Sequence, residues 1–509
     1  MITFSRFKQL FTHSLIATSA LTLIGCAQPL STLKTTTHSN VDNFNTTFYQ
    51  HTRPYTQAHP DKTGFYPLGD GQAAFLARLA VIEGAQKTLD VQYYIYRDDA
   101  TSNLLTWYLY QAAERGVRVR LLLDDMQNRD DQALASLSAH PNVEVRLFNP
   151  FGNRSFKPLS FLTDFDRLNR RMHNKAIIAD GVFAITGGRN IGDEYFSANG
   201  NVEFGDFDLL MMGKIIPQVS RQFDEYWNSK PAMPIEALVS EVHLPTTAQL
   251  QQWKHAQKQY LSSDYARSLK QHPMVQKLLN QTLPFYWADA ELVYDTPYKV
   301  ENSQDDLLLH QLSAMISKAK TDFLLISPYF VPTEAGAKTL AAAAKNGLNI
   351  TIVTNSLASN DVFAVHGWYA KYRQIMLDGG VKLYETKIDP ELKKKHSWLG
   401  SSRSSLHAKT FIIDRSKVFV GSFNFDPRSA YLNTELGVFV DSKPFADVFY
   451  KNLNNLLEKS AYRLALNDNN DIIWIDDNSG QQFDSEPDSS AMLKMGAWLA
   501  GALPIEKHL

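Results

Sequence analysis

Two short stretches of the chain carry the same residue types at the same spacing. In HNKAIIAD (173–180) and HAKTFIID (407–414), a lysine follows the histidine by two positions and an aspartate follows that lysine by five. An imidazole can act as a nucleophile or a proton donor, and an ammonium group can hold an anion. We therefore expect the histidine–lysine pairs to perform chemistry.

Further polar residues follow each motif in the same order. An asparagine lies seventeen positions after each histidine, and an acidic residue comes later still. We expect the acids to accept a hydrogen bond from the far ring nitrogen of each histidine, which fixes its tautomer. Turn residues, for the asparagines, and ordinary surface acids are the alternatives. The candidate site therefore contains His173, Lys175, Asp180, His407, Lys409 and Asp414 as the catalytic motifs, Asp206 and Glu435 as histidine-orienting residues, and the repeated asparagines Asn190 and Asn424.

Each motif is expected at a β-hairpin. A short apolar run follows each lysine, ends in a turn at Asp180-Gly181 or Asp414-Arg415-Ser416, and is followed by a second apolar run. Side chains alternate between the two faces of a strand, so the histidine and lysine of one motif project together and the aspartate does not. We therefore expect the aspartates to hold the turns and the backbone, and the histidine–lysine pairs to perform the chemistry.

The elements around the motifs are also duplicated. Residues 87–125 and 321–355 each predict a strand, a helix that stops at a glycine, and a second strand. Gly116 and Gly347 lie 231 positions apart, and the two motif histidines lie 234 apart. This indicates an internal duplication of a βαβ layout. Strands joined by helices imply an α/β fold with a mixed, mostly parallel sheet flanked by helices in each half.

Length and composition are consistent with two folded units. The chain has 509 residues, of which 44% are hydrophobic, and this exceeds what a single core usually holds. Proline and polar residues gather between the two repeats, where we expect a linker. The expected divisions are a signal peptide (1–26), a tether (27–63), an N-terminal domain (64–230), a linker (231–285) and a C-terminal domain with a tail (286–509).

The first residues have the pattern of an export signal. Arg6 and Lys8 precede an apolar run that ends in LIGC, and Cys26 is the only cysteine of the chain. LIGC resembles the bacterial lipobox, which implies that Cys26 is lipidated and that the protein is anchored to a bacterial envelope membrane on its extracytoplasmic face. An incidental cysteine in a cleaved peptide is the alternative. A single cysteine excludes an intramolecular disulfide and a cysteine metal cluster.

Taken together, the doubled HxKxxxxD motif with its G-[GS]-x-N segments resembles the phospholipase D superfamily. The stretches GGRNIGDEYF (187–196) and GSFNFDPRSAYLNTELG (421–437) resemble its bacterial cardiolipin synthase branch. The resemblance extends from about Gly64 to the carboxyl end. It implies two tandem pseudo-symmetric phospholipase D-type domains with the active site at their interface. It also implies that His173 attacks phosphorus to form a phosphohistidine and that His407 protonates the leaving alcohol. Both lysines and the phosphate-binding residues Asn190 and Asn424 would hold the phosphoryl oxygens, and neither a metal nor another cofactor would take part.

Basic and apolar residues alternate in the segments that precede the motifs, at 151–171 and 391–405. This combination suits an anionic bilayer surface and a lipid drawn partly out of it. Solvated loops are the alternative interpretation. The apolar segment 492–504 is a third candidate for contact with a membrane, or it packs against its own domain.

Three functions remain open from the sequence. The first is a phosphatidyltransferase that forms cardiolipin by moving a phosphatidyl group to phosphatidylglycerol, and the second is a phospholipase D that releases phosphatidic acid. The third is an extracytoplasmic nuclease or other phosphodiesterase, which the net charge of −2 disfavours because general polyanion binding needs an excess of cations. We expect phospholipids and a membrane surface as partners, and no nucleic acid; the need for an accessory protein is open.

Overall fold

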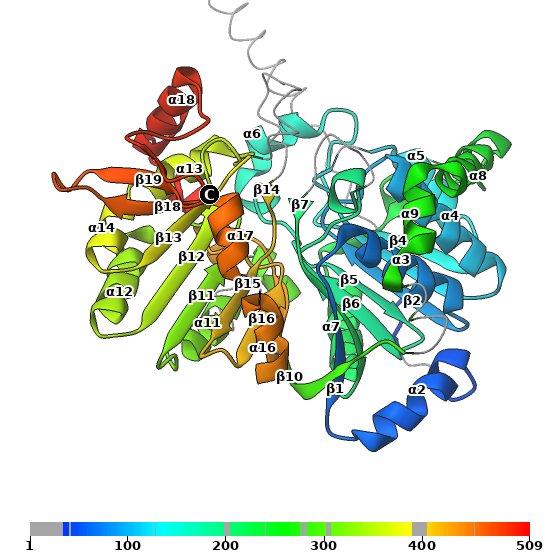
Figure 1. Ribbon diagram of the computed structural model, residues 1–509. Coiled ribbons are helices and arrows are strands. Elements are labelled where there is room, and N and C mark those ends of the chain that lie inside the picture. Colours follow the sequence, from blue (N-terminus) through cyan, green and yellow to red (C-terminus); the bar gives the residue numbers. More distant parts are fainter. Residues whose placement is uncertain are drawn as a thin grey trace, which may run out of the picture.

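The computed structural model describes residues 34–39, 42–127, 129–197, 204–239, 241–274, 277, 282–301, 307–388, 405–451 and 453–509. Two halves lie side by side, with β1 and β10 between them (Figure 1). Each half is a twisted sheet with helices on its faces, which confirms the α/β class and the duplicated architecture. Cys26 and almost all of segment 391–405 lie outside the described residues.

The strands of the N-terminal half lie in the order β9–β4–β3–β2–β5–β6–β8–β1. Only β2, β3 and β4 run parallel to one another. The remaining pairings are antiparallel, because β5 and β6 form a hairpin and the neighbouring strands enter from the opposite direction. The bounds are β1 Thr63–Leu68, β2 Thr88–Tyr93, β3 Arg118–Asp124, β4 Val143–Phe148, β5 Ala176–Ala179, β6 Phe183–Gly187, β8 Asp208–Gly213 and β9 Ala232–Pro234.

The C-terminal half repeats this order strand for strand, as β18–β13–β12–β11–β15–β16–β17–β10. It is extended beyond β18 by β19 and β20. The parallel strands are again the middle ones, β11, β12 and β13. The bounds are β10 Tyr286–Tyr294, β11 Asp322–Ile326, β12 Asn349–Asn355, β13 Lys382–Thr386, β15 Thr410–Ile413, β16 Lys417–Gly421, β17 Leu436–Asp441, β18 Ala461–Leu466, β19 Ile472–Asp476 and β20 Gln481–Phe483.

Helices cover both sheets, and two of them end as the sequence predicts. Gly116 and Gly347 follow α4 and α12 with φ of +90° and +98°, a conformation that glycine adopts without steric cost. The helices are α2 Thr47–Ala58, α3 Gly71–Gly84, α4 Ala100–Glu114, α5 Asp131–Ser138, α6 Lys157–Leu168, α7 Ile216–Asn228, α8 Thr247–Ser262, α9 Asp264–Gln271, α11 Leu308–Ile316, α12 Thr333–Lys345, α13 Phe363–Ala370, α14 Arg373–Asp378, α15 Pro427–Tyr431, α16 Lys443–Tyr450, α17 Leu453–Ser460 and α18 Ala491–Ala502.

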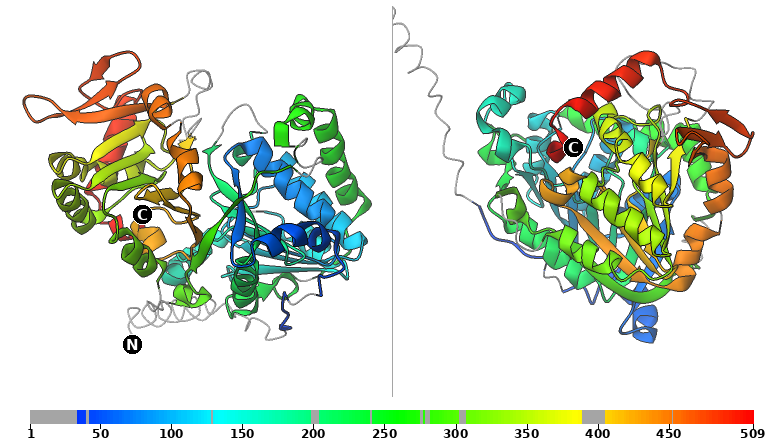
Figure 2. Two further views of the ribbon diagram at one scale, coloured as in Figure 1. Left: turned by 60° about the horizontal axis from the view of Figure 1, so that its bottom comes forward. Right: turned by 90° about the vertical axis from the view of Figure 1, so that its left-hand side faces the viewer.

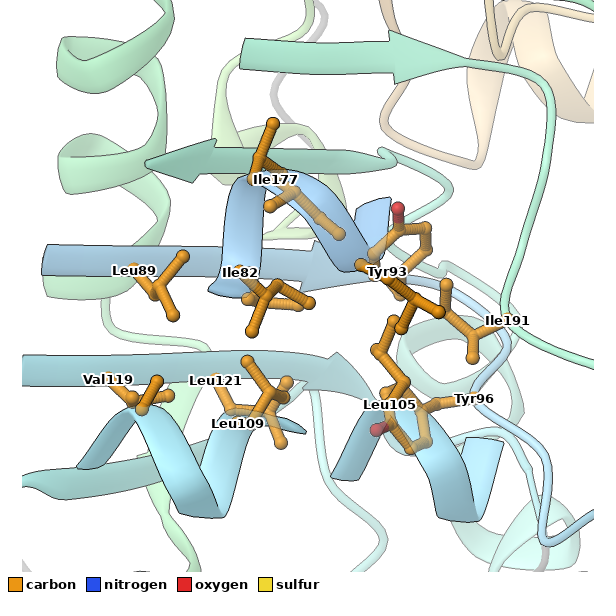
Figure 3. Packing of buried hydrophobic residues seen from close by; sticks show 14 of the residues in the cluster. Ile82, Leu89, Tyr93, Tyr96, Leu105, Leu109, Val119, Leu121, Ile177 and Ile191 are labelled. Atoms are coloured by element: carbon orange, nitrogen blue, oxygen red, sulfur yellow. The ribbon is translucent and has the colours of Figure 1, made fainter. Parts of the chain in front are cut away.

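The core of the N-terminal half lies between its central strands and the helices α3 and α4. Figure 3 shows Leu89 of β2 and Leu121 of β3 facing Ile82 of α3 and Leu109 of α4, and all four side chains are buried. Both faces of these parallel strands are covered, so apolar side chains can point to either side of the sheet. This packing holds the carboxyl ends of the strands, where the candidate site residues emerge.

The two halves are joined by a continuous sheet and a shared core. β1 pairs antiparallel with β10, with Thr63 opposite Ala288. Beneath this junction one apolar cluster contains Phe65 and Met172 from the first half together with Phe445 and Val438 from the second. Both features bury surface from both halves, so the interface is fixed rather than open.

The expected tether is in fact folded against the N-terminal half over its described residues. The Arg120 guanidinium donates to the carbonyl of Thr37 at 3.1 Å and to the hydroxyl of Ser39 at 2.6 Å, and α2 follows. Arg120 is buried and also forms an ion pair with Asp224. It therefore joins residues 37–39 to the N-terminal half through polar contacts that the sequence composition did not predict. The fold therefore begins before Gly64.

The expected linker is also largely folded. β9 pairs with β4, and α8 packs against α4, with Trp253 of α8 buried in the N-terminal core. The prolines and polar residues that suggested a linker lie at the ends of these elements and on their exposed faces. No helix within the described parts of the chain is both long and apolar enough to span a bilayer.

Candidate active site

Both motif histidines lie just before the first strand of a hairpin. β5 begins at Ala176, directly after Lys175, and β15 begins at Thr410, directly after Lys409. The histidines therefore stand at the ends of their strands rather than inside them. Near this point the two halves touch through a short parallel pairing of β7 (Phe204–Gly205) with β14 (Ser405–Leu406) (Figure 1).

The acid that contacts each histidine comes from the other half of the molecule. Nδ1 of His173 lies 2.8 Å from Oε2 of Glu435, and Nδ1 of His407 lies 2.6 Å from Oδ2 of Asp206. A carboxylate accepts a hydrogen bond from Nδ1–H, which leaves Nε2 with its lone pair. The structure thus brings the two expected acids to the two expected histidines, in a crossed arrangement.

The backbone follows the same crossed pattern. The N–H of His173 donates to the carbonyl of Thr434 at 2.9 Å, and the N–H of His407 donates to the carbonyl of Gly205 at 2.7 Å. Thr434 and Gly205 immediately precede the two acids. Each histidine is therefore fixed at its backbone and at its ring by the same segment of the opposite half.

The two lysines are buried beside the histidines. Nζ of Lys175 donates to the carbonyl of His173 at 2.6 Å, and Nζ of Lys409 donates to the carbonyl of His407. An ammonium group has three donors, so each lysine keeps capacity for a ligand oxygen. Burial lowers the pKa of Lys175 to about 7 and that of Lys409 to about 8, against the favourable charges of the nearby acids.

Both imidazoles are held in the neutral form. Burial, followed by the charge of Lys175, lowers the pKa of His173 well below its usual value. Burial and Lys409 lower the pKa of His407 to about 4, although Asp206 acts in the opposite direction. An anion bound between the rings would raise both values, because it favours the charged form of each imidazole.

The two acids differ in their electrostatic setting. Burial raises the pKa of Glu435 to about 7, against the opposing effects of Lys175 and Ser422. Burial acts to raise the pKa of Asp206, but His407 and Lys409 outweigh this effect, and the pKa is lowered. At neutral pH Asp206 is therefore a carboxylate, whereas Glu435 is close to its titration midpoint.

The two asparagines are not equivalent in the structure. The Asn190 side chain accepts from the N–H of Ile95 at 3.2 Å and donates to the Tyr195 hydroxyl at 3.0 Å, so both of its ends are used within its own half. Oδ1 of Asn424 is buried and has no hydrogen-bond partner among the described residues. The role of phosphate ligand remains a prediction for both, and the geometry leaves more freedom to Asn424.

The motif aspartates lie at the turns and bind backbone. Asp180 accepts from the N–H groups of Gln86, Lys87 and Thr88, and Asp414 accepts from those of Lys320, Thr321 and Asp322. Both have positive φ, +52° and +49°, as hairpin turns require. They anchor the loop that begins β2 or β11, and they do not reach the histidines.

Two tyrosines beside the histidines were not anticipated. The Tyr94 ring meets that of His173 edge-on at 5.0 Å, and the Tyr195 ring meets that of His407 at 5.3 Å. The positions 234 residues later hold Pro328 and Ser429, so the duplication gave no signal for them. Aromatic edges of this kind help to fix the plane of an imidazole and exclude water from it.

Arg189 and Arg428, which follow the two motifs in the sequence, hydrogen-bond segments that carry site residues. Arg189 donates to the carbonyls of Leu68, Gly69, Tyr195 and Asp206, and so holds the loop that carries Asp206. Arg428 donates to the carbonyl and side-chain oxygen of Asn169 and to the carbonyl of His508. It therefore ties the carboxyl end of the chain to the segment before His173.

Comparison with known proteins gives a family and many relatives. The family described as "Cardiolipin synthase, PLD-like domain" matches residues 79–227 and 312–457. Cardiolipin synthase C of Escherichia coli (strain K12) is 41% identical over 463 residues, which cover 89% of this chain and 98% of that protein. An uncharacterized protein of Helicobacter pylori (strain ATCC 700392 / 26695) is 30% identical over 443 residues, covering 86% of this chain and 88% of that protein.

One solved structure covers nearly the whole fold. The crystal structure of phosphatidylserine synthase from Haemophilus influenzae Rd KW20 aligns with a TM-score of 0.58 over 90% of this chain and 100% of that chain. The sequences are 11% identical over this alignment, so the likeness concerns the fold alone. It shows that the paired arrangement of the two halves is a known architecture.

Proposed function

We propose that this chain, which belongs to the family of cardiolipin synthases with phospholipase D-like domains, is a phosphatidyltransferase that forms cardiolipin by moving a phosphatidyl group to phosphatidylglycerol. The observation that carries the proposal is the crossed site. Each half supplies one histidine and one lysine, and supplies the acid for the histidine of the other half. A single phosphorus between the halves would meet a nucleophile, a proton donor and two ammonium groups.

The proposed reaction has two displacement steps. Nε2 of His173 attacks the phosphorus of the donor lipid, a phosphorus–nitrogen bond forms, and the bond to the headgroup oxygen breaks as His407 delivers a proton to that oxygen. A hydroxyl of phosphatidylglycerol then gives its proton to His407 and attacks the phosphorus, which breaks the phosphorus–nitrogen bond. One diester replaces another, so no external energy source is required.

The different acids support this assignment of roles. An ionised carboxylate stabilises an imidazolium, so His407 beside Asp206 is suited to carry the proton. His173 is held neutral beside Glu435, as a nucleophile must be. The phosphodiester anion would supply the missing negative charge on binding and raise the pKa of His407 towards the working pH.

Lysine and asparagine side chains would bind the phosphoryl oxygens. Lys175 and Lys409 bring charge into a buried site, where hydrogen bonds to an anion are strongest. Asn424 offers a buried amide, whose Nδ2–H groups can donate to a phosphoryl oxygen. Asp180 and Asp414 act through the backbone that they hold.

We further propose that the protein works on the extracytoplasmic face of a bacterial membrane, anchored by a lipid on Cys26. The lipobox-like sequence supports this, although it lies outside the described residues. The net charge of −2 supports lipids rather than nucleic acids as substrates.

A product assay tests the proposed reaction. The purified protein is incubated with phosphatidylglycerol, with and without phosphatidylethanolamine, and the lipids are separated. Cardiolipin is the expected product, and His173→Ala or His407→Ala removes it. Phosphatidic acid without cardiolipin would show a hydrolase instead, and cleavage of only a nucleic-acid control would show a nuclease.

A further inference from the structure

We propose that the end of the molecule that carries α6 and α18 docks on a phospholipid bilayer, so that the active site opens towards its substrate. The inference rests on the proposed function and adds the surface and the orientation. α6 and α18 lie at the same end of the molecule in two views at right angles to each other (Figures 1 and 2). Most large apolar side chains of the two helices are exposed; Phe161 of α6, whose ring lies 5.5 Å from that of Phe151, is an exception.

α6 presents an apolar stripe to the outside. Phe156 just before the helix, and Leu159, Leu162 and Phe165 on it, are all exposed, with Leu162 at 80% and a kink at Asp164 between the last two. Leu168 is the one buried residue of this helix. A surface helix normally turns its apolar stripe to the core, so the reversed orientation is typical of a helix that lies in a membrane interface.

α18 has the same character. It packs on α13 through small residues, because Ala497, Ala500 and Gly501 are buried and a Cβ at Gly367 would clash with the carbonyl of Ala497. Its exposed side chains are Met492, Met495, Trp498 and Leu499, followed by Leu503 just after the helix. Trp498 is 72% exposed, and tryptophan favours the boundary between water and lipid.

Both helices are directly connected to the site. α6 ends at Leu168, shortly before His173, and Arg428 holds the intervening Asn169. α13, on which α18 packs, begins at Phe363. The loop before it is joined to the second motif, because Asn355 at the end of β12 donates to the carbonyl of Leu406, the residue before His407, at 2.9 Å. A lipid held at this end of the molecule would therefore have a short path to the histidines.

The first described residues approach the same end. Lys34 donates to the carbonyl of Ser229, and Arg146 donates to the carbonyl of Thr35 at 2.6 Å. These contacts lie near the carboxyl end of β4, where Asn149 holds the end of α6 by donating to the carbonyl of Arg167 at 2.9 Å.

This position limits where a lipid on Cys26 could be. Eight positions separate Cys26 from Lys34, and an extended chain of that length reaches at most about 28 Å. A lipid on Cys26 would therefore insert beside the proposed docking surface. The anchor and the two apolar helices would then bind one and the same bilayer.

Single labels can locate the contact. Cys26 is the only cysteine, so Cys26→Ser gives a full-length chain in which one introduced cysteine carries an environment-sensitive fluorophore. Labels are placed by Leu162→Cys, by Trp498→Cys and, as a control, by Tyr55→Cys on α2, where the side chain is 47% exposed at the opposite end of the molecule (Figure 1). When vesicles of phosphatidylethanolamine and phosphatidylglycerol are added, the fluorescence emission of the labels at positions 162 and 498 should shift to the blue. The emission of the label at position 55 should not change. No shift at 162 and 498, or an equal shift at 55, would overturn the proposal.

A charge variant separates docking from chemistry. The double variant Leu162→Glu/Trp498→Glu is assayed on vesicles and on short-chain, water-soluble phosphatidylglycerol. The ratio of the first activity to the second should fall by about tenfold or more, because the loss of apolar surface weakens binding to the membrane. Tyr55→Glu should leave that ratio unchanged. An unchanged ratio in the double variant contradicts the docking surface. If the parent protein converts neither substrate while the labels at 162 and 498 still shift, the docking surface stands and the proposed reaction fails.

Discussion

Glu435 and Asp206 occupy corresponding places but carry different charge. Glu435 is fully buried, its pKa is raised to about 7, and it contacts the neutral His173. Asp206 has a lowered pKa and contacts His407 as a carboxylate. A duplicated site has thus acquired two unlike histidines, which is what a nucleophile and a proton donor require.

Amide substitutions should separate the two acids by their pH dependence. Because Glu435 is protonated below about pH 7 and ionised above it, Glu435→Gln should reduce kcat mainly above pH 7. Asp206 is ionised throughout this range, so Asp206→Asn should reduce kcat at every pH, on the order of 10³-fold. Rates measured from pH 6 to pH 9 check this. Parallel losses for the two variants would contradict the assigned charges.

The lysines predict an alkaline limit to activity. Burial lowers the pKa of Lys175 to about 7 and that of Lys409 to about 8, so the site loses its ammonium charges as the pH rises through this range. We expect kcat/KM of the free enzyme to fall from about pH 7 upwards, with an apparent value that belongs to the coupled cluster. Lys175→Arg should move the start of this fall towards pH 8, because a guanidinium stays charged, while the rate itself falls. A fall that still starts near pH 7 in this variant would assign it to another group.

At the scale of elements, the sequence predicted the duplicated units well. The hairpins, the glycines that end α4 and α12, and the backbone-binding role of Asp180 and Asp414 follow from local patterns of turn residues and alternating side chains. The docked residues 34–39 and the folded segment around α8 could not be predicted in this way. Their contacts depend on Arg120 and Trp253, which meet partners distant in the sequence.

The two turn aspartates should contribute unequally to stability. Asp180 is fully buried, and its three backbone donors would lose a charged acceptor in Asp180→Ala, which should cost about 3 kcal/mol of unfolding free energy. Most of the donors to Asp414 are exposed, so water replaces the carboxylate in Asp414→Ala and the cost should be about 1 kcal/mol. Urea unfolding of both variants measures this. Equal losses would show that the two turns are equally buried in solution.

At the scale of the whole molecule, the crossed site makes the halves interdependent. Each histidine takes both its ring contact and its backbone contact from the other half, and β1 and β10 join the sheets. The sequence identified both acids by their matching positions. It could not show which acid meets which histidine, because pairings over more than two hundred residues depend on how the halves assemble.

A double-mutant cycle across the interface tests this interdependence. If Glu435 acts by orienting His173, then the double variant His173→Ala/Glu435→Ala should be no less active than the single variant His173→Ala. The matched cycle of Asp206 with His407 should behave in the same way. Additive losses would mean that the acids act independently of the rings that they contact.

The central claim is that one imidazole from each half meets a single phosphorus. Trapping the covalent intermediate tests this claim most directly. A labelled phosphatidyl ester of p-nitrophenol is used as the donor, because its leaving group needs no proton from His407. His407→Asn should then accept the phosphatidyl group but lack the base for the second step, so the label should accumulate on His173 and be located there by mass spectrometry. His173→Asn should take up no label. Label on His407 in the His173 variant, or full transfer activity in either single variant, would contradict the account.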